Sequence, residues 1–311
     1  MKKVIVAILL CCLVLSGCAA QETSKPEAPG AVRFTDDLGR EVVVEHPQRV
    51  ACLTASFADI WCLAGGAESV VAATDATWKY FDLPLGEDVV RLGAAKSLNL
   101  EQLLACEPDL VLASCGSDRN VELEQAFSEM GLNVAYFAVD SFDDYLRMLD
   151  VCTRLTGQTE NYARYGTAVR ERVESAVARA DGSQPTVLYI RVTGSGYKVK
   201  NSEGSVLGEM LAAMDCANIA DSEESLLENL SIEAILQADP DFIFVVEQSA
   251  DPDAAKAVLE KTLFSNPAWQ TLTAVREGRV HVMDGSLFNL KPNSRWGEAY
   301  EQLAEILYGQ K

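Results

Sequence analysis

The chain has 311 residues, which is enough for about two domains of ordinary size. Hydrophobic residues make up 49% of it and charged residues 23%, a composition typical of a globular protein with a large core and not of a disordered chain. The formal net charge of −20 argues against nucleic-acid binding, because an acidic surface repels phosphate. No apolar run is long enough to span a membrane as a helix, which excludes a channel or permease subunit. The two histidines, His46 and His281, are too few for a histidine-rich metal site.

The first residues have the order of an export signal. Two lysines precede an apolar stretch that ends at Leu15, and Ser16, Gly17 and Cys18 follow. Basic, apolar and small residues in this order predict a signal peptide over residues 1–17. The ending resembles a bacterial lipobox, which implies that Cys18 carries a lipid and becomes the first residue of the mature chain. The lipid would anchor the protein to a membrane of the cell envelope, with the protein facing outside the cytoplasm. The polar residues of 18–31 predict a flexible tether.

The cysteines after Cys18 are predicted to be mostly reduced and buried. An exported protein can pair its cysteines, but several of these lie in apolar runs, where a free thiol packs as a small hydrophobic group. No two have the C-x-x-C spacing of zinc or iron–sulfur sites, so we expect no metal site and no resident cofactor. The cysteines concerned are Cys52, Cys62, Cys106, Cys115, Cys152 and Cys216.

An internal repeat predicts two lobes of the same design. Residues 99–114 (NLEQLLACEPDLVLAS) align without a gap with residues 231–246 (SIEAILQADPDFIFVV). In each copy a helix-capping residue precedes a short helix with a glutamate in its first turn, Glu101 or Glu233. A Pro-Asp pair then ends the helix, and an apolar run enriched in Val, Ile or Phe predicts a buried strand.

The surroundings of the repeat indicate parallel sheets. Each lobe opens with a strand followed by an apolar helix, at residues 49–54 and 56–64 in the first lobe and at 186–192 and 205–214 in the second. Alternating strands and helices build parallel α/β sheets. The sequence therefore predicts an α/β protein of two Rossmann-like lobes, an N-terminal one over residues 32–157 and a C-terminal one over residues 183–311.

A helical segment is predicted to join the lobes. Apolar residues recur at steps of three and four from Glu160 to Ala180, and Asp181-Gly182-Ser183 ends the pattern. Gly166 weakens a helix by about 1 kcal/mol relative to alanine, so packing must hold it in place. A linking helix over residues 158–182 would act as a stiff connection that makes large hinge closure difficult.

Motifs along nearly the whole mature chain resemble the class III substrate-binding lipoproteins of ABC importers, the group that binds siderophores, haem and cobalamin. The resemblance rests on the order and spacing of Thr35–Val42, Glu107–Val111, Pro240-Asp241, Asn266–Trp269 and Gly278–Val280. One departure is Asp215–Asn218, which stands where the family commonly has a Gly-Gly-x-Asn turn. The resemblance implies a ligand cleft between the lobes, an ABC permease dimer as partner and an iron chelate, siderophore or haem, as cargo.

The same resemblance gives the two repeated glutamates a role. Family members dock one glutamate from each lobe onto the permease, which implies this role for Glu101 and Glu233. The alternative is stabilisation of the helix dipole, which requires no partner.

Ligand-binding residues are expected in the loops beyond the carboxyl ends of the strands. Trp78 and Tyr80 could pack against a flat or apolar chelate, and Arg191, Lys198 and Lys200 could offset its negative charge, with Arg295 as a further candidate. The alternatives are ordinary core aromatics and a solvated loop with scattered charges. Bare metal ions are disfavoured, because these loops supply neither histidines nor clustered carboxylates.

The sequence offers two alternative functions. A corrinoid receptor of the same class stays open, because the sequence does not identify the ligand. A surface-anchored α/β enzyme has little support: Gly194-Ser195-Gly196 lacks the G-x-S-x-G elbow, and no nucleotide-binding loop occurs. His46 and His281 are each interpreted as structural residues. The sequence therefore indicates a binding protein and not an enzyme.

Overall fold

A β-hairpin opens the part of the chain that the structure describes. The computed structural model describes residues 30–193, 196–222, 225–228, 232–248, 257–258, 260–261 and 265–309. The expected signal peptide, Cys18 and residues 18–29 of the expected tether lie outside these residues. β1 (Ala31–Thr35) takes up the last residue of the expected tether and pairs antiparallel with β2 (Glu41–Glu45).

The first lobe is a parallel sheet with the strand order β5-β4-β3-β6-β7. Its strands alternate with helices, as predicted, because buried apolar runs are separated by capped helices and turns. The elements in chain order are β3 (Val50–Cys52), α1 (Ala55–Leu63), η1 (Ala67–Ser69), β4 (Val70–Ala73), α2 (Ala76–Tyr80), β5 (Val90–Arg91), α3 (Leu100–Ala105), β6 (Leu110–Ser114), α4 (Asp118–Glu122), α5 (Glu124–Glu129), β7 (Val134–Phe137) and α6 (Phe142–Thr156).

The second lobe repeats this design. Its strands β10-β8-β11-β12 are parallel, and β9 adds to β8 in the antiparallel direction. The described elements are β8 (Thr186–Thr193), β9 (Gly196–Lys200), α9 (Val206–Ala213), β10 (Ala217–Asn218), α10 (Ile219–Ser222), α11 (Ser225–Glu228), α12 (Ile232–Ala238), β11 (Phe242–Glu247), η4 (Trp269–Thr271), α14 (Thr273–Arg276), β12 (Val280–Met283), α15 (Gly285–Phe288), η5 (Asn293–Arg295) and α16 (Trp296–Tyr308). The predicted fold class, two α/β lobes with parallel sheets, is confirmed.

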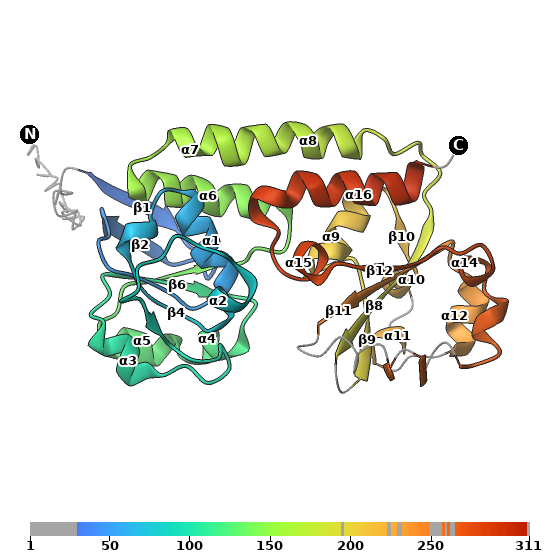
Figure 1. The fold of residues 1–311 in the computed structure, drawn as a ribbon, viewed down its shortest axis with the longest axis horizontal. Coiled ribbons are helices and arrows are strands. Elements are labelled where there is room, and N and C mark those ends of the chain that lie inside the picture. Colours follow the sequence, from blue (N-terminus) through green and yellow to red (C-terminus); the bar gives the residue numbers. More distant parts are fainter. Residues whose placement is uncertain are drawn as a thin grey trace, which may run out of the picture.

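A continuous helical segment runs along one side of both lobes (Figure 1). It consists of α7 (Glu160–Tyr162), a π-helical turn η2 (Ala163–Thr167) and α8 (Ala168–Val177), so it ends before the expected Ala180. The π turn surrounds the buried Gly166, where a Cβ atom would lie 3.2 Å from the Tyr162 ring. The hydroxyl of Tyr145 on α6 donates to the carbonyl of Tyr165 at 2.8 Å. This bond supports a carbonyl in a stretch where the regular α-helical pattern is interrupted.

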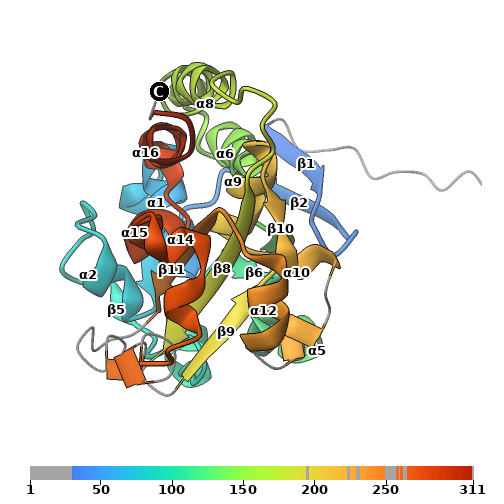
Figure 2. The ribbon, with the colours of Figure 1, turned by 90° about the vertical axis from the view of Figure 1, so that its right-hand side faces the viewer.

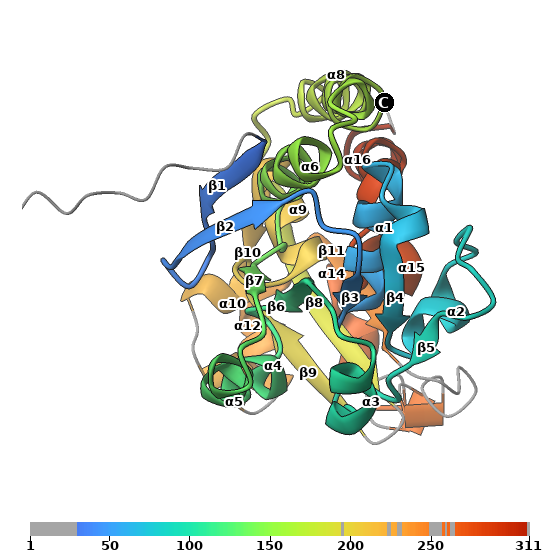
Figure 3. The same cartoon turned by 90° about the vertical axis from the view of Figure 1, so that its left-hand side faces the viewer.

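The two lobes share one apolar core. A single cluster of buried residues includes Leu112 and Phe137 of the first lobe and Tyr189 and Phe244 of the second. α16 packs along α8. Arg172 of α8 forms an ion pair with Glu301 at 2.8 Å, and Arg179, just after the end of α8, forms one with Glu305 at 2.7 Å. Viewed along the long axis, α6 and α9 lie to one side of α16, α2 lies to the other, and α15 lies below α16 (Figures 2 and 3).

The repeated Pro-Asp motif has the same structural role in both lobes. The residue before the proline, Glu107 or Asp239, has a positive φ of 42° or 40°, which turns the chain out of the preceding helix. The Asp109 carboxylate accepts the backbone N–H groups of Gln48 and Arg49, just before β3. The Asp241 carboxylate accepts the N–H and hydroxyl of Thr186, the first residue of β8. Each aspartate therefore fixes where the central strand of its lobe begins.

The segment Asp215–Asn218, which departs from the family's Gly-Gly-x-Asn turn, still begins with a turn. Asp215 adopts a φ of 60° and accepts a hydrogen bond from the Gln184 side chain, so a non-glycine residue takes the left-handed conformation there.

The six cysteines after Cys18 all lie within the described residues and form no disulfide. Burial raises the pKa of the Cys62 thiol to about 12, which makes it inert at neutral pH.

Candidate ligand-binding site

A cavity of about 740 Å³ lies at the carboxyl ends of two strands of the second lobe. β11 ends at Glu247 and β12 at Met283, and both residues line the cavity together with Tyr80 from the first lobe. Ligands of open α/β sheets bind in this position, and the volume lies within the range of about 300–1,000 Å³ usual for small-molecule sites. We call it the interlobe cavity; its other lining residues are Gln248, Val282, Asp284, Gly285, Ser286, Asn289 and Leu290.

The structure separates the two candidate aromatic residues of α2. Tyr80 is 47% exposed and lines the interlobe cavity, with the Lys79 ammonium 5.0 Å from its ring centroid. Trp78 instead packs against the apolar core, and the Arg91 guanidinium lies 4.4 Å from its ring centroid. Trp78 is therefore not among the residues that line the cavity.

Arg191, Lys198 and Lys200 form a basic cluster on one face of the second sheet. Arg191 on β8 lies directly opposite Lys198 on β9, and Lys200 lies opposite Tyr189. Cross-strand partners share a face, so all four side chains project from the same side of the sheet. This is the face on which Tyr189 joins the core shared with the first lobe. The basic cluster therefore faces the region between the lobes.

The charges of the basic cluster are not neutralised. Among the residues that the structure describes, none of the three side chains forms a salt bridge with a carboxylate. Burial lowers the pKa of Lys200, and the positive charges of Arg191 and Lys198 lower it further, with Asp140 of the first lobe opposing them. Arg191 donates one bond to the Tyr189 hydroxyl at 3.3 Å, while its Nε is buried without a partner. An anion placed here would accept charge-assisted hydrogen bonds and would relieve the repulsion among the three positively charged side chains.

Arg295 lies beside the interlobe cavity, but its charge is already compensated. Its Nε and one Nη donate to the Glu298 carboxylate at 2.8 and 2.9 Å, and this pairing raises the pKa of Arg295. Its other Nη lies 3.4 Å from the hydroxyl of Ser286, which lines the cavity. Arg295 therefore contributes less positive potential than the basic cluster does.

Sequence reasoning missed a strap, residues 290–295, that connects the lobes. Lys291 forms an ion pair with Asp140 of the first lobe at 2.9 Å. Asn293, fully buried with a φ of 52°, donates its amide to the carbonyl of Ser56 at 2.8 Å and to the carboxylate of Asp59 at 2.7 Å. Ser56 and Asp59 belong to α1 of the first lobe. The Pro-Asn pair is a turn signal, but nothing local shows that its side chain crosses to the other lobe.

We expect Asn293→Ala to lower the free energy of unfolding by about 2 kcal/mol, since two buried hydrogen bonds are lost, one of them to a carboxylate. Denaturant unfolding measures this loss, and hydrogen exchange should speed up in α1 and in the strap. The matched control is Asn218→Ala, which removes a buried asparagine whose bonds to Lys200 and Ala220 stay within the second lobe. Equal acceleration of exchange at α1 in both variants would contradict a bridging role for Asn293.

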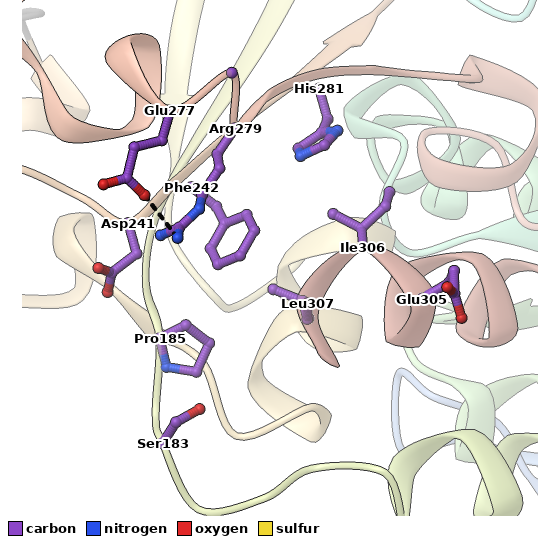
Figure 4. A pocket seen from close by; sticks show the side chains of 11 residues that line it. Ser183, Pro185, Asp241, Phe242, Glu277, Arg279, His281, Glu305, Ile306 and Leu307 are labelled. Atoms are coloured by element: carbon purple, nitrogen blue, oxygen red, sulfur yellow. Dashed lines mark ion pairs between the residues drawn. The ribbon is translucent and has the colours of Figure 1, made fainter. Parts of the chain in front are cut away.

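A second cavity, of about 550 Å³, lies at the amino ends of the second lobe's strands (Figure 4). His281 on β12 stacks on the rings of Phe242 and Phe244, at centroid distances of 6.2 and 5.7 Å, and burial lowers its pKa. Arg279 forms an ion pair with Glu277, at 2.6 Å, and also lies over Phe242. Because the charged groups around this cavity are already paired and ligands bind at the opposite end of such sheets, the interlobe cavity is the better candidate.

The repeated glutamates lie in equivalent positions of the two lobes. Glu101 and Glu233 are exposed residues in the first turns of α3 and α12. Both helices lie at the side of the molecule away from α8 (Figure 1). The expected capping of the first copy is confirmed, since Asn99 accepts the N–H of Gln102, whereas Ser231 of the second copy lies outside the described residues.

Comparison with known proteins identifies the family of this chain. The periplasmic binding protein family matches residues 50–287, and the chain belongs to this family. The chain is 24% identical to the putative ABC transporter substrate-binding lipoprotein YhfQ of Bacillus subtilis (strain 168), over 94% of this chain and 93% of the relative. It is also 24% identical to the Fe(3+)-citrate-binding protein YfmC of the same strain, over 89% and 87%.

A solved structure supports the fold. The periplasmic vitamin B12 binding protein BtuF of Vibrio cholerae matches with a TM-score of 0.69 at 20% identity, covering 84% of this chain and 97% of that chain. The chain is therefore a substrate-binding protein of the ABC importer class and not an enzyme. In the described part of the chain, no helix has both the length and the hydrophobicity needed to cross a bilayer.

Proposed function

We propose that this protein captures an anionic iron chelate, a siderophore in preference to haem, and delivers it to an ABC permease. The observation that carries the proposal is the basic cluster, three uncompensated positive charges between the lobes of a chain whose net charge is −20. Local positive charge in an acidic protein attracts and orients an anionic ligand. The relative YfmC, named as a ferric citrate-binding protein, supports the same class of ligand.

The ligand binds, in this proposal, between Tyr80 and the basic cluster. The exposed Tyr80 ring packs against the apolar rim of the chelate, while Arg191, Lys198 and Lys200 bind its anionic groups. Arg295 contributes through its neighbour Ser286 at the wall of the interlobe cavity. The shared core and the strap hold the lobes together, which suits a preformed site for a bulky, rigid ligand.

The anchor in this proposal is a lipid on Cys18. The apolar segment and small residues before Cys18 support it, as does the relative YhfQ, which is named as a lipoprotein. Residues 18–29 connect the lipid to β1, and the body of the protein then faces away from the cytoplasm. Delivery uses Glu101 and Glu233, one on each lobe, as contacts for the two subunits of a permease dimer.

Fluorescence-quenching titrations with a matched panel test the ligand class. The panel contains ferric citrate, a ferric catecholate, a ferric hydroxamate, haemin and cyanocobalamin. We expect saturable binding of at least one anionic iron chelate, weakened by added salt as expected for charge pairing. Binding of cyanocobalamin alone would replace the proposal by a corrinoid receptor, and no binding of any iron chelate would refute it.

Metabolic labelling with a radioactive fatty acid tests the anchor separately. The wild-type protein should be labelled, and Cys18→Ala should not be. A labelled Cys18→Ala protein would contradict the anchor without affecting the proposed ligand class.

A further inference from the structure

A third cavity, of about 750 Å³, lies beneath the linking helix and apart from the interlobe cavity. It shares no lining residue with the interlobe cavity. It lies among α6, α8, α9 and α16, whereas the interlobe cavity is lined from α2, from α15 and from the ends of β11 and β12. We call it the helix cavity; its lining residues are Ser141, Phe142, Asp143, Arg170, Val173, Glu174, Val177, Ala178, Glu209, Ala212, Ala213 and Tyr300.

The floor of the helix cavity is apolar. Phe142 of α6 and Val173 of α8 both line the cavity with buried side chains. The small residues Ala212 and Ala213 of α9 leave the opposite wall open. An alkyl or aryl group placed against Phe142 and Val173 would lose water contact on that side, which is the main source of affinity for apolar ligand groups.

Tyr300 places an unused polar group in this apolar setting. Its side chain is only 3% exposed and lines the cavity from α16, yet its hydroxyl forms no hydrogen bond with any described residue. Burial raises the pKa of Tyr300, and the nearby carboxylates of Asp143 and Glu209 raise it further. The hydroxyl is not one of the fully buried polar atoms, so it is accessible from the cavity and can accept a hydrogen bond from a ligand there.

The charged residues around Tyr300 favour a positively charged ligand. Three carboxylates, Asp143, Glu174 and Glu209, line the cavity against one base, Arg170. Burial raises the pKa of Glu209; the Gly204 N–H opposes this, and the acids Asp140, Asp144 and Glu203 raise it further. An anion would be repelled here, whereas a cation would relieve the repulsion among these acids.

We propose that the helix cavity binds a protonated primary amine with an apolar body, an alkyl- or arylammonium ion. The ammonium group donates hydrogen bonds to the phenol oxygen of Tyr300 and to the carboxylate of Glu209, and the apolar body lies on Phe142 and Val173. This site is independent of the proposed function: its ligand has the opposite charge to the chelate, and the two cavities share no lining residue.

Three probes of equal chain length test the site: n-octylammonium, octan-1-ol and octanoate. Binding is followed by calorimetry and by NMR shifts of the alanine methyl groups of α9. We expect n-octylammonium to bind at least about tenfold more tightly than octan-1-ol, and octanoate not to bind, because a hydrogen bond to a charged group contributes this much. Octanoate binding as tightly as n-octylammonium, or no shift at Ala212 and Ala213, would overturn the proposal.

A pair of matched tyrosine variants locates the ammonium group. Tyr300→Phe removes the unpartnered hydroxyl and should weaken n-octylammonium binding about fivefold. Tyr308→Phe removes a hydroxyl on the same helix that donates to the carbonyl of Met214, outside the cavity, and should leave binding unchanged. Thermal unfolding confirms that both variants fold. Unchanged binding in Tyr300→Phe, or an equal loss in Tyr308→Phe, would overturn the assignment.

Discussion

Replacing both Glu101 and Glu233 with arginine should abolish uptake of the cargo by cells, while the purified protein keeps its ligand affinity. Both residues are exposed in the first turns of α3 and α12, and neither lines the interlobe cavity. In the proposed docking, reversal replaces attraction by repulsion at two permease contacts. Losing one partner of a charge pair at an interface costs about 2–5 kcal/mol, so the rate of uptake should fall by more than about tenfold.

The matched control reverses Glu160 and Glu171 on the linking helix. This variant has the same change in net charge, and both residues are exposed on the side of the molecule away from α3 and α12. Helix-dipole stabilisation alone would give a modest loss of thermal stability, about 0.3–1 kcal/mol for each first-turn glutamate, and no loss of uptake. Normal uptake by the Glu101/Glu233 variant would therefore refute docking and leave the dipole role.

Arg191→Ala should weaken binding of an anionic iron chelate by about 10-fold to 150-fold, the effect of losing a hydrogen bond to a charged group. The change should cost the fold little, because it removes one 3.3 Å hydrogen bond to Tyr189 but also relieves the repulsion between Arg191 and the neighbouring Lys198 and Lys200. Removing its charge should also raise the pKa of Lys200, which Arg191 now lowers. NMR titration of the Lys200 side chain measures that shift without any ligand.

Arg276→Ala is the control for this second experiment. Arg276 is an exposed residue at the end of α14, so its replacement changes the net charge equally without touching the basic cluster. An equal loss of affinity in both variants would point to the overall charge of the protein. An Arg191→Ala variant that binds the chelate as tightly as the wild type would remove the basic cluster from the proposed site.

Much of the fold was predictable because its signals are local. Capping residues, Pro-Asp pairs and apolar runs each act within a few positions. Because the repeat shows the same pattern once in each lobe, both lobes and their central strands were predicted correctly. The linking helix was predicted in outline. Its π turn was not, because the turn depends on the Tyr145 hydroxyl reaching across from α6 to the carbonyl of Tyr165.

The sequence by itself determined the class of protein and the basic cluster. Arg191, Lys198 and Lys200 are close in the chain, and strand alternation with one reversal of direction is enough to place them on one face. Only the tertiary structure decided that Tyr80 reaches the interlobe cavity while Trp78 packs inward. It alone revealed the bond from Asn293 to Ser56, 237 positions apart in the chain, because contacts at that separation depend on how the two lobes pack together and leave no local pattern.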